Sequence, residues 1–295
     1  MVLRVHRPGP PLDRFVECFW HNEGERLSHR RERLLPNGSF ALLFSLSEAP
    51  IRRFVHDTDT AGLTLPDAAI CGAQSSYAVR DTTQPRTVLG VHFRPGGAAP
   101  LLGLPAGLVT DGHVGLDALW GLHARELREL LVEAATPEAR FGLIERALLA
   151  RLDTAPRHHP AVSYALRRLG AAPSLARIAE VRDETGYGAK RFIALFRDSV
   201  GLTPKLYCRV RRFQDAIERL ARGEAVEWAE IAADAGFADQ PHLNREFRAF
   251  AGLTPTQYRP VAPDRPNHVA IQENSVQDGP RALGHVGGGS CVDPL

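Results

Sequence analysis

A short run of polar side chains in the C-terminal third has the spacing of one helix face. Gln240, Asn244, Arg245 and Arg248 fall on the same side of a helix, and apolar residues occupy positions between them. In the major groove of DNA, amide side chains pair with adenine and guanidinium groups pair with guanine. The run therefore predicts a helix that contacts DNA. The simpler alternative is a solvated helix face, which is the usual explanation for polar residues on a helix.

Three further basic or polar residues extend this predicted contact surface. His242 lies just inside the same helix, where it either binds a phosphate or has a structural role. Lys205 and Arg209 lie near the start of a second predicted helix, residues 206–223, whose other basic residues are expected to be solvated. We expect Lys205 to contact phosphate, with Arg209 as the weaker candidate. Phosphate contacts orient a protein on the duplex without reading its sequence.

The polar run belongs to the second copy of an internal repeat. Residues 181–207 and 231–258 each contain a glycine followed by an aromatic residue, and each closes on the string Gly-Leu-Thr-Pro-x-x-Tyr. Such a duplication is hard to obtain by chance. Each glycine, Gly186 or Gly236, suits the left-handed turn that ends one helix before the next begins. Asp239 suits the N-cap of the second helix. Each copy therefore predicts a helix-turn-helix unit.

The first copy differs from the second at the positions that would face DNA. These positions hold Ala189, Lys190, Ile193 and Ala194. Lys190 and the adjacent Arg191 are expected to hold phosphates, whereas Ile193 and Ala194 either touch a thymine methyl group or pack on another part of the protein. We expect the first unit to position the protein and the second unit to supply most of the sequence discrimination.

The duplicated unit with its connecting helix resembles the DNA-binding domain of AraC/XylS-type transcription regulators. The resemblance covers roughly residues 160–260, and it rests on Gly236 to Phe247, which read G-F-x-D-Q-x-H-L-x-R-x-F, and on the string ending at Tyr258-Arg259. It implies a sequence-specific, bacterial, cytoplasmic regulator. Position in the family motif makes Asn244 and Arg245 the best candidates for base contact. The full expected DNA-binding set is Gln240, His242, Asn244, Arg245, Arg248, Lys190, Arg191 and Lys205.

The N-terminal half has a different pattern. Short apolar runs at 15–20, 40–47 and 87–93 are separated by Gly, Pro and Asn, which is typical of strands. Residues 116–152 show the three- and four-residue periodicity of two amphipathic helices that separate near Thr136-Pro137. These segments resemble a sensor-like domain found ahead of such DNA-binding units. The resemblance implies ligand sensing or self-association and names no ligand.

These patterns predict an α+β multidomain protein. A small β-rich, barrel-like domain with C-terminal helices would span residues 1–155. An all-α domain of two helix-turn-helix units joined by a long helix would span 156–261, after a hinge that contains Pro156 and Pro160. Residues 262–295 are rich in Pro, Gly, Asn and Ser, so we expect a disordered tail there.

The distribution of charge agrees with this division. The net charge of the chain is +2. Residues 157–260 hold 17 Lys and Arg against 12 Asp and Glu, so the basic excess lies in the predicted DNA-binding part. The excess is modest, because many solvated surfaces carry as much.

Other chemistry has little support in the sequence. The four cysteines, Cys18, Cys71, Cys208 and Cys291, form no CxxC pair, and no H-x-H pattern of a metal site occurs in the N-terminal half. No catalytic arrangement stands out, and no apolar run is long enough to span a membrane. We therefore expect no enzyme, no cofactor, no metal and no membrane partner.

The leading prediction is a DNA-binding transcription regulator modulated by a small molecule or by self-association. Two alternatives stay open: an enzyme targeted to DNA, such as a repair methyltransferase, and a constitutive DNA-binding protein without a sensed ligand. The expected partners are double-stranded DNA, a small-molecule effector, a second copy in a homodimer, and RNA polymerase if the protein is an activator.

Overall fold

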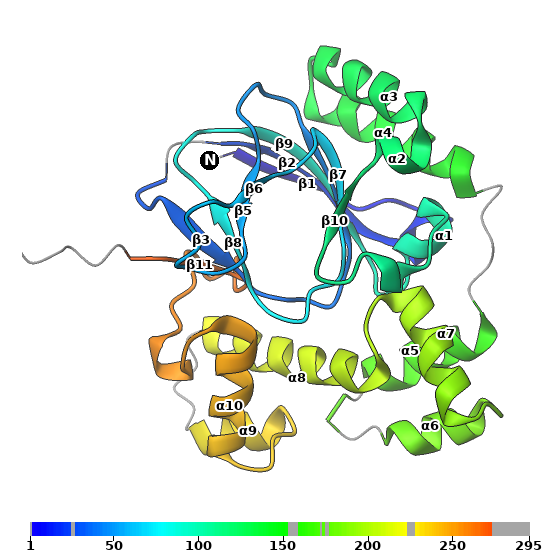
Figure 1. Cartoon of the computed structure of the whole chain (residues 1–295), viewed down its shortest axis with the longest axis vertical. Coiled ribbons are helices and arrows are strands. Elements are labelled where there is room, and N and C mark those ends of the chain that lie inside the picture. Colours follow the sequence, from blue (N-terminus) through cyan, green and yellow to red (C-terminus); the bar gives the residue numbers. More distant parts are fainter. Residues whose placement is uncertain are drawn as a thin grey trace, which may run out of the picture.

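The computed structural model describes residues 2–24, 27–152, 159–171, 173–174, 177–222 and 228–272. A β-rich part built from two antiparallel sheets lies against a helical part, in which α8 runs beneath the strands (Figure 1). The predicted division into β-rich and all-α parts is confirmed. No helix among the described residues has the length and apolar character that a membrane crossing requires.

The larger sheet has six strands. Its order is β1 (Val2–His6), β2 (Val16–Glu23), β9 (Thr87–Phe93), β4 (Ala41–Ser45), β7 (Ala68–Cys71) and β10 (His113–Gly115). The predicted runs at 15–20, 40–47 and 87–93 correspond to β2, β4 and β9. Because side chains alternate along a strand, Phe19 and His21 face the helices, whereas Cys18, Trp20 and Asn22 face the interior between the sheets.

The smaller sheet has five strands. Its order is β11 (His268–Ala270), β3 (Arg31–Leu34), β8 (Ala78–Asp81), β5 (Arg52–Phe54) and β6 (Leu63–Thr64). The two sheets enclose a space that side chains leave partly open. The structure therefore has the barrel-like form expected from the sequence.

Helices cover the outer face of the larger sheet. The predicted pair at 116–152 corresponds to α3 (Leu122–Glu133) and α4 (Pro137–Leu152), with the short α2 (Asp117–Trp120) before them. Phe141 of α4 contacts Phe19 of β2 with ring centroids 6.4 Å apart. Two shorter elements, α1 (Ala98–Leu102) and η2 (Ala106–Leu108), contact the helical part through α7.

The C-terminal part is helical throughout its described residues. Two helix-turn-helix units, α6 (Ile178–Glu184) with α7 (Ala189–Val200) and α9 (Trp228–Asp234) with α10 (Gln240–Ala251), are joined by α8 (Pro204–Ala221). The helix α5 (Pro160–Ala171) precedes them, and η3 (Pro255–Gln257) follows. The long connecting helix expected at 206–223 is therefore present. The predicted hinge falls mainly at 153–158, outside the described residues.

The expectation of a disordered tail from residue 262 is wrong for its first part. Strand β11 lies in this segment and pairs with β3 over three residues, from His268 opposite Leu34 to Ala270 opposite Glu32. Val269 is buried, with 3% of its surface exposed. The composition argument failed because a short strand added to an existing sheet edge needs no core of its own. The rest of the predicted tail, residues 273–295, lies outside the described residues.

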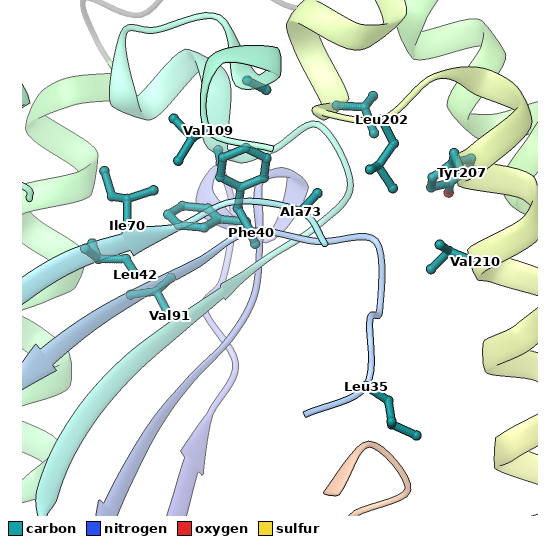
Figure 2. Close-up of a cluster of buried hydrophobic side chains, with 14 of the residues drawn as sticks. Leu35, Phe40, Leu42, Ile70, Ala73, Val91, Val109, Leu202, Tyr207 and Val210 are labelled. Carbon is teal, nitrogen blue, oxygen red and sulfur yellow. The ribbon is translucent and has the colours of Figure 1, made fainter. Parts of the chain in front are cut away.

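A continuous hydrophobic core joins the two parts. Figure 2 shows Phe40, Ala73 and Val109 of the β-rich part next to Leu202, Tyr207 and Val210 of the helical part, and all six are buried. Polar bonds reinforce this contact, since buried Gln214 of α8 donates to the carbonyl oxygen of Pro36 at 2.7 Å and to Asn267 Oδ1 at 2.7 Å. The predicted domains therefore share an extensive interface.

A buried carboxylate anchors the smaller sheet. Glu32 has no exposed surface, and its Oε2 accepts a hydrogen bond of 2.6 Å from Arg80 Nε. His268 Nδ1 lies 3.4 Å from Glu32 Oε1, and His29 Nε2 lies 3.8 Å from it. Burial alone would raise the pKa of Glu32, but His268 and Arg80 hold it at about 2.

We predict that Glu32→Gln destabilises the protein by about 3 kcal/mol at pH 7, because it leaves Arg80 without its counter-charge. A lowered carboxyl pKa stabilises the fold fully above the unfolded value of 4.5 and loses this contribution as pH falls toward 2. The difference from wild type should therefore shrink below about pH 4.5, which denaturant unfolding at several pH values would measure. Glu48→Gln, at an exposed carboxylate, is the control. A pH-independent gap would contradict this account.

Candidate nucleic-acid interface

The second helix-turn-helix unit has a sharply defined turn. Gly236 has a φ of +76°, which lets α9 end and the chain reverse before α10. Asp239 caps α10, since its carboxylate accepts a 2.6 Å hydrogen bond from the backbone N–H of His242. Phe237, Leu243 and Phe247 are buried under the turn and along the inner face of α10. The cap and the apolar face thus fix which side of α10 points outward.

The outward side carries most of the predicted DNA contacts. Gln240, Arg245 and Arg248 are exposed, and Asn244 is half-buried beside them. Among the described residues, neither Arg245 nor Arg248 takes part in an ion pair. The amide and guanidinium groups on this outward side are therefore available to base edges or phosphates.

His242 belongs to the turn itself. Its Nδ1 accepts a 3.3 Å hydrogen bond from the backbone N–H of Ala238, and its ring meets that of Phe237 edge-on at 5.5 Å. Of the two roles that the sequence left open, these contacts give His242 a structural one. Its contact with phosphate stays a prediction.

A partly buried ion pair fixes α10 to the connecting helix. Glu246 is only 9% exposed and accepts two hydrogen bonds from Arg209 of α8, at 2.8 and 2.9 Å. The guanidinium of Arg209 also lies 5.2 Å from the ring centroid of Phe250. Arg209 was the weaker sequence candidate for phosphate contact. This engagement gives it a structural role, and its contact with phosphate stays a prediction. The sequence offered no signal for the pair, because its members are 37 residues apart.

The first helix-turn-helix unit has the same turn geometry as the second, but its N-cap makes no side-chain hydrogen bond. Gly186 has a φ of +75°, and Gly188 takes the N-cap of α7 without a side-chain hydrogen bond. Phe192 and Phe196 are buried. The positions expected to face DNA are all exposed, namely Ala189, Lys190, Arg191, Ile193 and Ala194. Ile193 is 43% exposed, so it does not pack on another described part of the protein.

The connecting helix sets the spacing of the two units. Its 18 residues correspond to a length of about 27 Å at the usual helical rise. This separation approaches the ~34 Å between successive major grooves on one side of B-DNA. Lys205 is exposed at the second residue of α8, directly after the first unit. The structure therefore presents two separate exposed helix faces, of which that of α10 is polar and that of α7 is mixed, with a basic side chain between them.

A second candidate site lies inside the β-rich part. A cavity of about 440 Å³ opens between the two sheets, a volume in the range of small-molecule sites. Cys18 and Cys71 line it. Burial raises the pKa of the Cys18 thiol to about 11 and also raises that of Cys71. Both thiols are therefore protonated near neutral pH. The described residues include no group of three or more His, Cys, Asp or Glu suited to a metal ion.

We predict that Gly236→Ala is more destabilising than Gly186→Ala. A left-handed alanine costs about 1–2 kcal/mol at either turn. At Gly186 the added methyl group meets no atom within 4 Å, whereas at Gly236 it would lie 2.3 Å from Ser174 Cβ and 2.7 Å from Ser174 Cα. Urea unfolding of the full-length variants measures the difference. Equal losses of stability in the two variants would contradict this prediction, because they would show that Ser174 can move away from the added methyl group at little cost.

Comparison with known proteins finds matches for two separate segments of the chain. Residues 181–260 match a family described as a helix-turn-helix domain, and residues 4–115 match a domain of unknown function (DUF6597).

Among curated proteins, the probable transcriptional regulator LumQ of Photobacterium leiognathi is 28% identical over 82 residues, which are 28% of this chain and 33% of LumQ. The match thus spans about a third of that relative. The arabinose operon regulatory protein of Escherichia coli K12 is 24% identical over 196 residues, covering 62% of this chain and 67% of that protein. The crystal structure of ToxT from Vibrio cholerae O395 has a TM-score of 0.44 at 11% identity, covering 81% of this chain and 96% of ToxT.

Proposed function

We propose that the chain, whose residues 181–260 match a helix-turn-helix domain, is an AraC-type, sequence-specific DNA-binding transcription regulator of the bacterial cytoplasm. The observation that carries the proposal is the pair of exposed recognition helices, α7 and α10, held at the two ends of α8. A single chain can thereby enter two major grooves. The DNA-binding unit would comprise residues 156–261, and residues 1–155 would form the sensing or self-association unit.

The cavity in the β-rich part supports modulation by a small molecule. It has the volume of a ligand site, and both apolar side chains and polar or charged side chains line it. A constitutive DNA-binding protein would not need a cavity of this kind.

The alternative of a repair methyltransferase loses support, because burial raises the thiol pKa of Cys18, Cys71 and Cys208. A second copy of the chain and, for an activator, RNA polymerase complete the proposed partners.

The proposal is tested by binding of the full chain to its own upstream DNA and to a scrambled duplex over a range of salt concentrations. A specific regulator should prefer the native duplex by at least about a thousandfold, with a steep salt dependence. Equal, weak binding to both duplexes, with no preferred sequence recovered from a random DNA pool, would contradict it.

We predict that Arg245→Ala and Lys205→Ala weaken DNA binding in different ways. Arg245→Ala should cost about 1–3 kcal/mol and relax base preference at one position, since guanidinium groups read guanine. Lys205→Ala should weaken binding to all sequences alike and reduce the salt slope by about 1, because it removes one phosphate contact. Arg146→Ala, an exposed arginine on α4, is the control and should change neither quantity. Identical profiles for the two variants would contradict these roles.

The two recognition helices should also contribute unequally to specificity. Ile193 presents only methyl groups to a thymine methyl, whereas α10 presents hydrogen-bonding groups that distinguish all base pairs. Ile193→Ala should therefore change base preference less than Arg245→Ala does. Selection from a random DNA pool with each variant measures both effects. A greater loss of preference with Ile193→Ala would show that the first unit carries the discrimination.

A further inference from the structure

The interior of the β-rich part combines an apolar wall with a row of charged groups. The apolar wall comes mainly from the larger sheet and adjacent loops, and its side chains include Leu3, Val5, Trp20, Leu43, Ile51 and Leu65. On the smaller sheet, strand pairing aligns Glu32 with Arg80 and Arg80 with Arg53. Alternation along the strands turns all three toward the interior. A bound molecule would therefore meet apolar groups on one side and charges on the other.

This row contains one carboxylate for two guanidinium groups. Glu32, which is fully buried behind the lining, pairs with Arg80 at 2.6 Å. Two acidic residues line the cavity: Asp81 pairs with Arg86 at 3.0 Å, and Asp264 is exposed. Arg53 has no carboxylate within ion-pair distance among the described residues. Its neighbours are the Cys71 thiol and the Gln74 amide, whose oxygen, when turned toward it, accepts from the guanidinium. Burial lowers the pKa of His113, and the positive charge of Arg53 across the interior lowers it further. Arg53 is thus an uncompensated cation beside an apolar cavity.

The segment that follows the second helix-turn-helix unit closes one side of this cavity. Residues 261–272, here called the strap, line it through Arg265, Asn267, His268 and their neighbours. The strap is held to β3 by backbone bonds, in which Leu35 N–H donates to Asn267 O at 2.8 Å and Ile271 N–H donates to Arg31 O at 2.9 Å. Tyr258, at the end of the DNA-binding unit, donates its hydroxyl to Pro266 O at 2.7 Å.

The strap also touches the helix that spaces the two recognition helices. Asn267 Oδ1 accepts a 2.7 Å hydrogen bond from buried Gln214 of α8. The same amide of Gln214 donates to Pro36 O, and Pro36 lines the cavity. Asn267 therefore contacts the cavity on one side and α8 on the other.

We propose that the cavity binds an organic anion with an apolar body, held at Arg53, and that the bound anion fixes the strap against α8 and thereby changes the affinity for DNA. The ligand class follows from the apolar wall and the uncompensated guanidinium, which forms strong charge-assisted hydrogen bonds with carboxylates, sulfonates or phosphates. The effect on DNA rests on the proposed function, whereas the binding of an anion does not.

The ligand class is tested on the full chain with two fluorescent probes that share a ring system. Anilinonaphthalene sulfonate carries a negative charge, and phenylnaphthylamine carries none. The sulfonate should bind more tightly than the neutral probe, and Arg53→Met should raise its Kd about tenfold while leaving that of the neutral probe unchanged. Arg53→Lys should retain part of the preference. Arg52→Met is the matched control, because Arg52 is the adjacent strand residue and lies over Phe54, outside the cavity.

The place of binding is tested by energy transfer from tryptophan. Trp20 lines the cavity, so in a Trp120→Phe/Trp228→Phe variant, which keeps Trp20 as its only tryptophan, the bound sulfonate should quench nearly all tryptophan emission. Equal affinities for the two probes, an unchanged Kd in Arg53→Met, or weak quenching in that variant would each overturn the anion site.

The role of the strap is tested by hydrogen exchange and DNA binding. The sulfonate should slow amide exchange at Leu35 and Ile271, the two donors that hold the strap, and should change the Kd for DNA several-fold. Val269→Asp should unseat β11 and abolish the probe's effect on DNA, and Asn267→Ala provides the milder variant if Val269→Asp misfolds. A DNA response that survives both variants would overturn the coupling.

The two failures can be told apart. If no DNA sequence is bound by wild type while the sulfonate still depends on Arg53, the proposed function fails and the anion site stands. If DNA binding is specific and depends on Arg245, but the sulfonate never binds through Arg53, the function stands and the anion site falls.

Discussion

Apolar contact between the loops of the β-rich part and the helical part around α8 is the constraint on which the rest of the arrangement depends. Phe40 and Leu35, from the loop between β3 and β4, are buried together with Val210 and Leu202 of the helical part. Removing such side chains from water is the main source of stability in folded domains. Because this core extends across both parts, it fixes the orientation of α8 relative to the β-rich part, while the length of α8 sets the spacing of the two recognition helices. The same loop lines the cavity through Pro36, Asn37 and Ser39.

The two helix-turn-helix units have the same architecture, but different contacts hold their recognition helices in place. In the second unit, Asp239 caps α10 with its side chain, Ser174 packs against the turn at Gly236, and Arg209 forms an ion pair with Glu246. The first has a glycine cap and an open turn around Gly186. A recognition helix held firmly on its inner face can keep hydrogen-bonding groups aligned with base edges. A helix that offers Ile193 and Ala194 needs less alignment, since apolar contact is not directional.

The sequence predicted the features that depend on neighbouring residues. Glycines at the turns, the cap at Asp239 and the apolar face of α10 follow from local rules, and so do the strand runs and the helix pair at 122–152. It did not predict the features that depend on distant partners. Neither the ion pair of Arg209 nor the edge strand β11 has a local signature, because Glu246 and β3 lie far away in the chain. The cavity was missed for the same reason, since its wall is assembled from segments between residues 3 and 268.

Strand β11 has a consequence for the order in which the protein is made. Its partner, β3, is among the first elements to leave the ribosome, whereas β11 comes after every described helix. Domains generally fold as units during synthesis, starting from the N-terminus. The smaller sheet must therefore wait with one edge unpaired until both helix-turn-helix units have emerged. An open strand edge is a site of unwanted pairing with other chains. Here β11, the last strand of the described residues, covers β3 and becomes a three-residue edge strand itself, so the C-terminal region covers an edge that the N-terminal domain would otherwise expose.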